Sequence, residues 1–303
     1  MGAEIGGVTP THLYRSSQLG AARTVRVAAG DIRYFERGSG PCIVFAHGWL
    51  TNANLWRKVV PLLADRYRCI ALDLPLGAHG APVEPEADLS PPGCGAIILD
   101  VIEALDLQDV TLVGNDSGGA YSQIGVAARP QRIGRLVLAS CETPDDIFPP
   151  PPFTGLRPAA QSIEFLKQAL QGLRSRERRL RPEAFGLLAK HPVEDVVFDS
   201  YALPVLENDA ILHDVSKAMR SASEIHVQRA GEKLIACFRK PVLLAWSPED
   251  PVFPIAHARK YAAALPNARL ELIDDAFSFT PEDQPRKLAG LIEIFIADDS
   301  DKG

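Results

Sequence analysis

The sequence predicts an α/β protein with a mostly parallel eight-stranded sheet and one inserted helical cap. Short apolar segments rich in β-branched residues alternate along the 303 residues with segments whose apolar residues recur at helical spacing. This alternation is typical of parallel strands joined by helices. About 100 residues between the predicted strands at 135–140 and 241–246 lack any strand pattern. Because a loop of that length is implausible inside a compact domain, we expect these residues to form helices.

Eight segments have the composition of β-strands. They are residues 24–29, 32–37, 42–47, 69–73, 110–115, 135–140, 241–246 and 269–274. Gly30 and Asp31 join the first two, which favours an antiparallel hairpin. Apolar residues recur at helical spacing near residues 54–65, 92–105, 118–128, 254–264 and 283–297.

The helical insertion divides the chain into two predicted domains. Residues 1–144 and 236–303 are expected to form the α/β core, and residues 145–235 a helical cap. The cap is expected to lie over the carboxyl edge of the sheet, where folds of this class bind their ligands.

The composition argues against several classes of protein. A net charge of −6 gives no reason to expect nucleic acid or an anionic membrane as a partner, and no apolar run is long enough to span a membrane. Five scattered cysteines and the absence of a signal pattern in residues 1–20 favour a reduced, cytoplasmic protein. No metal-ligand spacing or dinucleotide fingerprint occurs, so we expect neither a metal nor a cofactor. The expected partner is a small hydrophobic substrate, and a homodimer is an alternative that the sequence leaves open.

The most specific chemical signal is the stretch VTLVGNDSGG at residues 110–119. A β-branched strand runs into a glycine-flanked turn and then into a helical pattern, which is the nucleophile elbow G-x-Nuc-x-G. Gly114 and Gly118 are needed because side chains on them would clash in this strained turn. The central residue is Asp116. A carboxylate there would attack carbon and form an alkyl ester, whereas a serine would form an acyl ester. The alternatives are that Asp116 caps the following helix, or that Ser117 is the nucleophile.

Four motifs together resemble the α/β-hydrolase superfamily, and within it the haloalkane dehalogenase and epoxide hydrolase branch. They are HGW at 47–49, DLPLGAHG at 73–80, GNDSGG at 114–119 and SPEDPVFP at 247–254. The resemblance covers roughly residues 24–297. It implies an α/β-hydrolase fold and a hydrolase with Asp116 as its nucleophile.

The resemblance also implies roles for residues around the elbow. The backbone N–H groups of Trp49 and Ser117 would form an oxyanion hole, and His47 and Gly48 would lie beside the substrate. The indole N–H of Trp49 would hold a halide, or else the ring only packs under the cap. Tyr201 in the cap would donate a hydrogen bond to substrate, or else it belongs to the cap core.

The acid positions match the family pattern, but the histidine position does not. Asp250 follows the seventh strand, where relatives keep the acid that orients the catalytic histidine; alternatively it is only a turn residue. Glu142 occupies the other position at which relatives keep an acid. Relatives place the histidine just after the last strand, and the matching residue here is Ser278. Without a base the alkyl ester should form but hydrolyse slowly. The substitute base considered first is His79, whose alternative role is that of a solvated loop residue.

Three hypotheses follow. In the first, the protein hydrolyses an epoxide or an alkyl halide through Asp116, with an atypical or impaired base. In the second, it is a lyase, isomerase or cyclase in which Asp116 acts as an acid or a base. In the third, it binds a ligand and has lost turnover.

Overall fold

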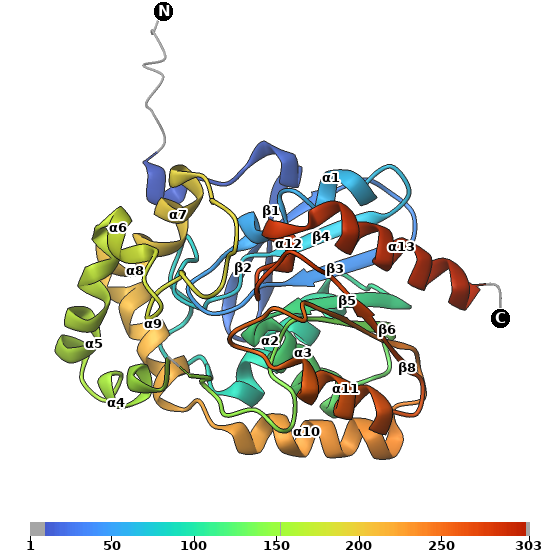
Figure 1. Cartoon of the computed structure of the whole chain (residues 1–303). Helices are drawn as coiled ribbons and strands as arrows, with labels where there is room; N and C mark the ends of the chain where they lie inside the picture. The colour runs from blue at the N-terminus through green and yellow to red at the C-terminus, as the bar shows by residue number, and fades with distance from the viewer. Residues whose placement is uncertain (1–9, 152, 301–303) are drawn as a thin grey trace, which may run out of the picture.

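The fold is built on an eight-stranded sheet with the strand order β1-β2-β4-β3-β5-β6-β7-β8 (Figure 1). The computed structural model describes residues 10–151 and 153–300. The strands are β1 (Ala21–Val27), β2 (Gly30–Arg37), β3 (Cys42–Ala46), β4 (Arg68–Leu72), β5 (Val110–Asn115), β6 (Ile133–Ala139), β7 (Val242–Trp246) and β8 (Ala268–Leu272). All eight predicted strands are present, with ends shifted by a few residues.

The pairing of the strands confirms the predicted mostly parallel sheet. The β1 and β2 strands form the expected antiparallel hairpin, and β2 is also antiparallel to β4. All other neighbouring strands are parallel. Every residue of β5 is buried, as expected of a central parallel strand covered on both faces. The carboxyl ends of β3, β5 and β6 therefore meet at one edge of the sheet.

Helices cover both faces of the sheet (Figure 1). The helical segments outside the long insertion are η1 (Thr11–Leu13), η2 (Ser17–Leu19), η3 (Ala53–Trp56), α1 (Val60–Leu63), α2 (Pro91–Ala104), α3 (Ser117–Ala128), α11 (Ile255–Ala264), α12 (Thr280–Asp283) and α13 (Pro285–Ser300). The α1 and α13 helices pack together on one face, and α2 packs against α3 on the other. None of the described helices is both long enough and apolar enough to cross a membrane.

Two predicted helices are divided, and prolines explain both divisions. The stretch 54–65 forms the separate segments η3 and α1, with Pro61 at the start of α1. The stretch 283–297 is interrupted before Pro285, where α13 begins. Proline has no backbone N–H to donate inside a helix, so it is tolerated only in the first turn.

The residues between β6 and β7, here called the insert (140–241), are helical and contain no strand in their described part, as predicted. The insert contains η4 (Phe153–Gly155), α4 (Leu156–Ala159), α5 (Ile163–Leu170), η5 (Gln171–Arg174), α6 (Arg176–Arg179), α7 (Asp195–Ala202), α8 (Pro204–Glu207), α9 (Asp209–Arg220) and α10 (Glu224–Cys237). Helices α4 to α9 gather beside the sheet, whereas α10 packs against α3 of the core (Figure 1). The domain boundary at residue 235 thus falls inside α10 and stays a prediction.

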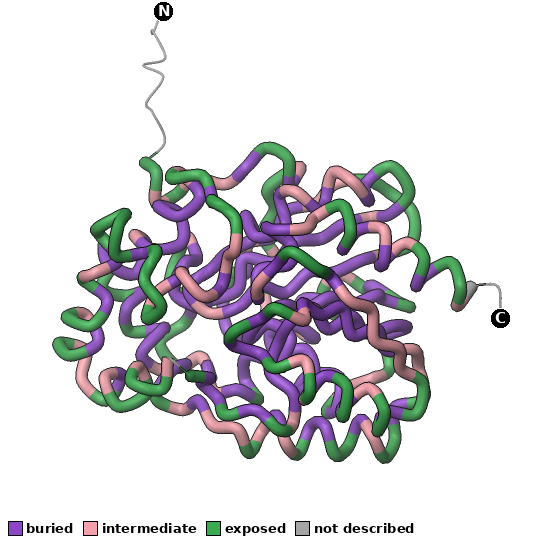
Figure 2. The backbone as a smooth tube through the Cα atoms, in the orientation of Figure 1, coloured by how far each residue is buried: buried purple, intermediate pink, exposed green. Residues whose placement is uncertain are grey.

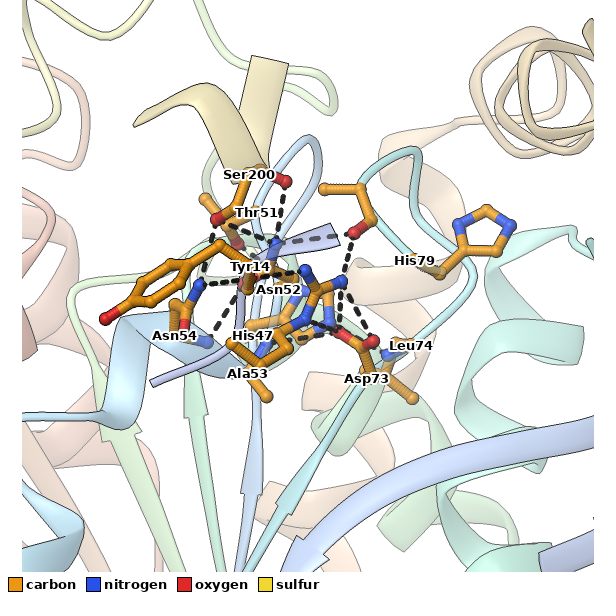
Figure 3. Close-up of polar contacts among 12 residues, drawn as sticks. Tyr14, His47, Thr51, Asn52, Ala53, Asn54, Asp73, Leu74, His79 and Ser200 are labelled. Atoms are coloured by element: carbon orange, nitrogen blue, oxygen red, sulfur yellow. Dashed lines mark hydrogen bonds and ion pairs between the residues drawn. The ribbon is translucent and has the colours of Figure 1, made fainter. Parts of the chain in front are cut away.

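Buried residues follow the sheet and the inner faces of its helices (Figure 2). One buried polar network also joins the core to the insert (Figure 3). Arg15 donates to Asp73 at 2.9 Å, and both side chains are almost fully buried. Asn52 donates to the carbonyl oxygen of Ser200 at 2.8 Å, and Asn54 donates to its hydroxyl at 2.9 Å. The network fixes the N-terminal segment, the loop after β3 and helix α7 relative to one another.

We predict that Arg15→Met lowers the free energy of unfolding by about 3–5 kcal/mol, because it leaves the Asp73 carboxylate buried without its cation. Chemical denaturation measures the loss. The matched control is Arg26→Met, because Arg26 pairs with Asp31 and Glu84 on the exposed surface. We expect no measurable loss there. Equal losses in the two variants would contradict the assigned role of Arg15.

Candidate active site

The turn between β5 and α3 holds Asp116 in a strained backbone conformation. Its φ and ψ angles are 53° and −145°, a region that side chains other than glycine seldom adopt. The Asp116 N–H donates to the carbonyl oxygen of Ser140 at 3.0 Å, which ties the turn to the end of β6. The side chain makes no capping hydrogen bond, which would come from the second or third residue of α3, so the structure does not support the helix-cap interpretation. Strain at such a position is typical of a functional residue.

Two glycines allow the loop after β3 to lie directly against this turn. A β-carbon on Gly48 would lie 2.2 Å from Oδ2 of Asp116. A β-carbon on Gly118 would lie 2.4 Å from the carbonyl oxygen of His47. Neither position can therefore carry a side chain without moving backbone or the carboxyl group. The Asp116 carboxyl group therefore lies directly against Gly48, and the predicted place of Gly48 beside the substrate stays a prediction.

Asp116 lines a cavity of about 240 Å³ between the core and the insert. Most of the wall is apolar. The core contributes Trp49, Leu50 and Tyr121, and the insert contributes Phe148, Phe153, Leu156, Phe185, Leu188 and Met219. Two buried polar residues, Ser117 and Glu142, share the wall with Asp116, and the exposed side chains of Arg178, Arg181 and Glu183 also line it. A cavity of this kind suits a small hydrophobic ligand.

The burial of Asp116 alters its acidity. Removal from water raises the pKa of Asp116 to about 7, and the charge of Asp250 acts in the same direction. A hydrogen bond from the Ser117 backbone N–H opposes the shift. Both the carboxylate and the neutral acid are therefore present near neutral pH.

Glu142 is a second buried acid in the same cavity. It is 1% exposed, and neither of its carboxyl oxygens has a hydrogen-bond partner among the described residues. Burial, and next the charge of Asp116, raise the pKa of Glu142 well above its usual range. Its surroundings therefore favour the protonated, neutral form of Glu142. Its place directly after a buried strand was visible in the sequence, but its lack of any partner was not.

Asp250 and Ser278 form the pair that the sequence pattern places after β7 and β8. The Ser278 hydroxyl donates to Oδ1 of Asp250 at 2.8 Å. The same oxygen accepts N–H groups from Val252 and Phe253, so Asp250 is also a turn residue. Oδ2 of Asp250 has no partner among the described residues, and burial raises the pKa of Asp250 to about 6. Ser278 thus contacts Asp250 and is not part of the cavity wall, which corrects its predicted role in substrate binding.

Asn115 fixes this pair beside the elbow, a role that the sequence analysis missed. Its side-chain amide donates to the carbonyl oxygens of Ala139 at 2.6 Å and Ser278 at 2.7 Å. The loop after β8 is thereby held against the ends of β5 and β6. The sequence did contain a signal for this role, because Asn115 is an amide residue placed between a buried strand and the elbow turn.

The predicted oxyanion hole has one of its two donors already engaged. The backbone N–H of Trp49 donates to the Ser117 hydroxyl oxygen at 2.8 Å. The backbone N–H of Ser117 acts on Asp116, because it opposes the rise in the pKa of that carboxyl group. The indole N–H of Trp49 is buried and has no acceptor among the described residues. Trp49 therefore has a free ring donor in the cavity wall.

The structure corrects the predicted role of His47, which holds the loop and does not bind ligand. Its Nδ1 contacts the carbonyl oxygen of Gly48 and its Nε2 accepts the N–H of Leu74, both at 2.8 Å (Figure 3). These bonds define a neutral ring that donates from Nδ1. Burial lowers the pKa of His47 to about 4, so the ring stays neutral at physiological pH.

The predicted base His79 and the predicted donor Tyr201 also lie outside the cavity wall. His79 is buried, accepts the N–H of Gly77 and contacts Asp214 of the insert at 3.2 Å, so it is neither solvated nor directed at Asp116. The Tyr201 ring packs against Phe185 and Phe198 within the insert. The described residues of the wall include no histidine. In the same part of the chain, no cluster of ligating side chains could hold a metal ion.

Residues 41–285 match the model of the alpha/beta hydrolase fold family. The chain belongs to this family.

Its relatives include proteins of several activities. A 2-hydroxy-6-oxononadienedioate/2-hydroxy-6-oxononatrienedioate hydrolase of Paraburkholderia xenovorans is 27% identical over 93% of this chain and 97% of its own length. A haloalkane dehalogenase of Mesorhizobium japonicum is 39% identical, but over only 36% of this chain and 35% of its own length. The solved haloalkane dehalogenase DatA from Agrobacterium tumefaciens has a TM-score of 0.76 at 22% identity, covering 94% of this chain and 99% of its own. At that identity the likeness shows the fold.

We predict that Asp116→Asn stabilises the protein, and more so at high pH. The folded pKa of about 7 exceeds the usual value of 3.8, so folded Asp116 keeps a proton that the unfolded chain has lost. The free energy of unfolding therefore falls as the pH rises from 4 towards 7. At pH 8 the substitution should recover about 2–4 kcal/mol, and near pH 4 almost nothing.

Denaturation of both proteins across this pH range measures the effect, with the exposed Asp31→Asn as the control. A gain in stability that does not depend on pH would show that the Asp116 carboxyl group is not the buried titrating group.

Proposed function

We propose that this protein is a hydrolase-fold enzyme whose Asp116 attacks carbon in a small hydrophobic epoxide or alkyl halide. The observation that carries the proposal is the Asp116 carboxyl group in a strained turn, lining an apolar cavity. A carboxylate that attacks an electrophilic carbon forms an alkyl ester and displaces the leaving group. The apolar wall binds the body of the substrate, and the free indole N–H of Trp49 can stabilise a departing halide or alkoxide.

The second step, hydrolysis of the ester, lacks its usual base. Ser278 occupies the position next to Asp250 where relatives hold an imidazole, and a serine hydroxyl does not deprotonate water near neutral pH. General-base assistance is worth about 10²–10⁴-fold. The ester is therefore expected to persist unless another group in the cavity takes the proton.

Intact-mass measurement after incubation with a reactive alkyl halide tests the first step. We expect the protein mass to increase by one alkyl group, and Asp116→Asn to prevent the increase because its amide is a poor nucleophile. The matched control is Ser117→Ala, which should still form the adduct. An adduct that persists in Asp116→Asn would exclude Asp116 as the nucleophile. Neither adduct nor turnover with a broad panel of halides and epoxides would favour the lyase, isomerase, cyclase or ligand-binding alternatives.

Ser278→His tests the missing base. The new ring would lie next to Asp250, which contacts the present hydroxyl at 2.8 Å, and should accelerate loss of the alkyl adduct by up to about 10²–10⁴-fold. The decay of the adduct mass after removal of free halide measures the rate. Ser278→Ala removes the hydroxyl without adding a base and should give no acceleration. An unchanged rate in Ser278→His would mean that residue 278 is not the base position.

A further inference from the structure

We propose that Glu142 is the acid and base of this site: it protonates the oxygen of an epoxide as Asp116 attacks, and then deprotonates the water that releases the product. This inference rests on the proposed function and deepens it, because it names the group that replaces the missing imidazole and selects the epoxide among the candidate substrates.

The position of Glu142 next to Asp116 follows from the sheet. Their strands are neighbours, and the hydrogen bond from the Asp116 N–H to Ser140 brings the start of the Glu142 loop to the elbow. Gln123 of α3 donates to the Glu142 carbonyl oxygen at 2.8 Å. The main chain of Glu142 is thus fixed while its carboxyl group lines the cavity with Asp116.

The carboxyl group of Glu142 has no structural partner, unlike other buried acids of the chain. Four of these are paired with a basic side chain: Asp73 with Arg15, Asp199 with Arg179, Asp214 with His79, and Glu282 with Arg57. Neither oxygen of Glu142 has a hydrogen-bond partner in another described residue, and the one donor that acts on the carboxyl group is its own backbone N–H. A buried polar group without a partner destabilises the fold, so its presence in a ligand cavity points to a partner on the ligand.

The surroundings keep Glu142 protonated when Asp116 is ionised. The acidic groups that act on Glu142 are Asp116 from the elbow and Asp146 from the same loop as Glu142. Asp146 also contacts His257 at 2.7 Å. Both charges, together with burial, raise the pKa of Glu142. When Asp116 is ionised, the remaining proton of the pair therefore resides on Glu142.

Ring opening then balances within the site. An Asp116 oxygen forms a bond to one epoxide carbon, the bond from that carbon to the ring oxygen breaks, and the ring oxygen takes the Glu142 proton. The products are a hydroxyalkyl ester on Asp116 and a Glu142 carboxylate. Protonation of the leaving oxygen in the transition state is general acid catalysis.

Hydrolysis uses the carboxylate that ring opening has produced. The Glu142 carboxylate takes a proton from water as the water oxygen attacks the ester carbon of Asp116. The resulting intermediate then breaks its bond to the alkyl oxygen, which takes the remaining water proton and leaves as a diol. Asp116 returns as a carboxylate and Glu142 as a neutral acid, so no further reactant is needed.

Reaction with an alkyl halide does not convert Glu142 into the carboxylate that acts as the base. Halide leaves as an anion without a proton, so Glu142 stays protonated and the ester on Asp116 is left without a base. We therefore expect epoxides to be turned over, and halides of the same length to accumulate as the alkyl ester.

The experiment compares epoxyhexane and bromohexane on Glu142→Gln, which keeps the shape of the side chain but cannot exchange an acidic proton. Diol formation from epoxyhexane should fall by about 10²-fold or more, while adduct formation with bromohexane stays within about twofold of wild type. The matched control is Asp214→Asn, which removes a buried carboxyl group outside the cavity and should leave both reactions intact. Glu142→Asp keeps the acid on a shorter side chain and should retain part of the diol formation.

Each other outcome identifies what has failed. Equal losses with both substrates would show that Glu142 has only a structural role. Undiminished diol formation in Glu142→Gln, or wild-type adducts from bromohexane without any reaction of epoxyhexane, would overturn the role of Glu142 and leave Asp116 as the nucleophile. No reaction with either substrate would overturn the proposed function, and this inference with it.

Discussion

The structure depends on burying three carboxyl groups at one edge of the sheet without a cation to neutralise them. The pKa values of Asp116, Glu142 and Asp250 are shifted mainly by burial, by neighbouring acids and by a few hydrogen-bond donors. No lysine, arginine or histidine is among the main causes of these shifts. Several other buried acids of this chain are paired with basic side chains, as in Arg15 with Asp73. Such an arrangement costs stability, and it leaves groups that exchange protons near neutral pH.

The surrounding fold makes this arrangement tolerable by fixing the backbone around each acid. Asn115 links the loop of Ser278 to β5, and Gln123 fixes the main chain of Glu142. His47 is held neutral between two backbone groups and supports the loop whose glycine touches Asp116. These polar residues lie around the cavity rather than in its wall, so they act on its shape and not on the ligand.

The chain belongs to the alpha/beta hydrolase fold family, and the described wall of its cavity contains Asp116 and Glu142 but no histidine. Asp250 still accepts a hydrogen bond from the residue in the histidine position, but the donor is the hydroxyl of Ser278. Under the proposed function, Asp116 therefore has no imidazole in the cavity wall to act as a base. Glu142 follows β6 and lines the same cavity, and it is the group that we propose takes this role. In this proposal, the pathway of the proton rather than the nucleophile distinguishes the site.

The fold and the elbow could be predicted from sequence because both depend on local patterns. Strand composition, the glycines around Asp116 and the spacing of the four motifs are written in neighbouring residues. The partners of polar side chains cannot be read from neighbouring residues, because they come from segments far apart in the chain. His79 turns to Asp214 of the insert, and Tyr201 packs against phenylalanines, although both sequence contexts suggested the site. Only the tertiary structure determined that Glu142 is buried beside Asp116 with no partner, because a side chain's dielectric surroundings and hydrogen bonds exist only once distant segments have packed around it.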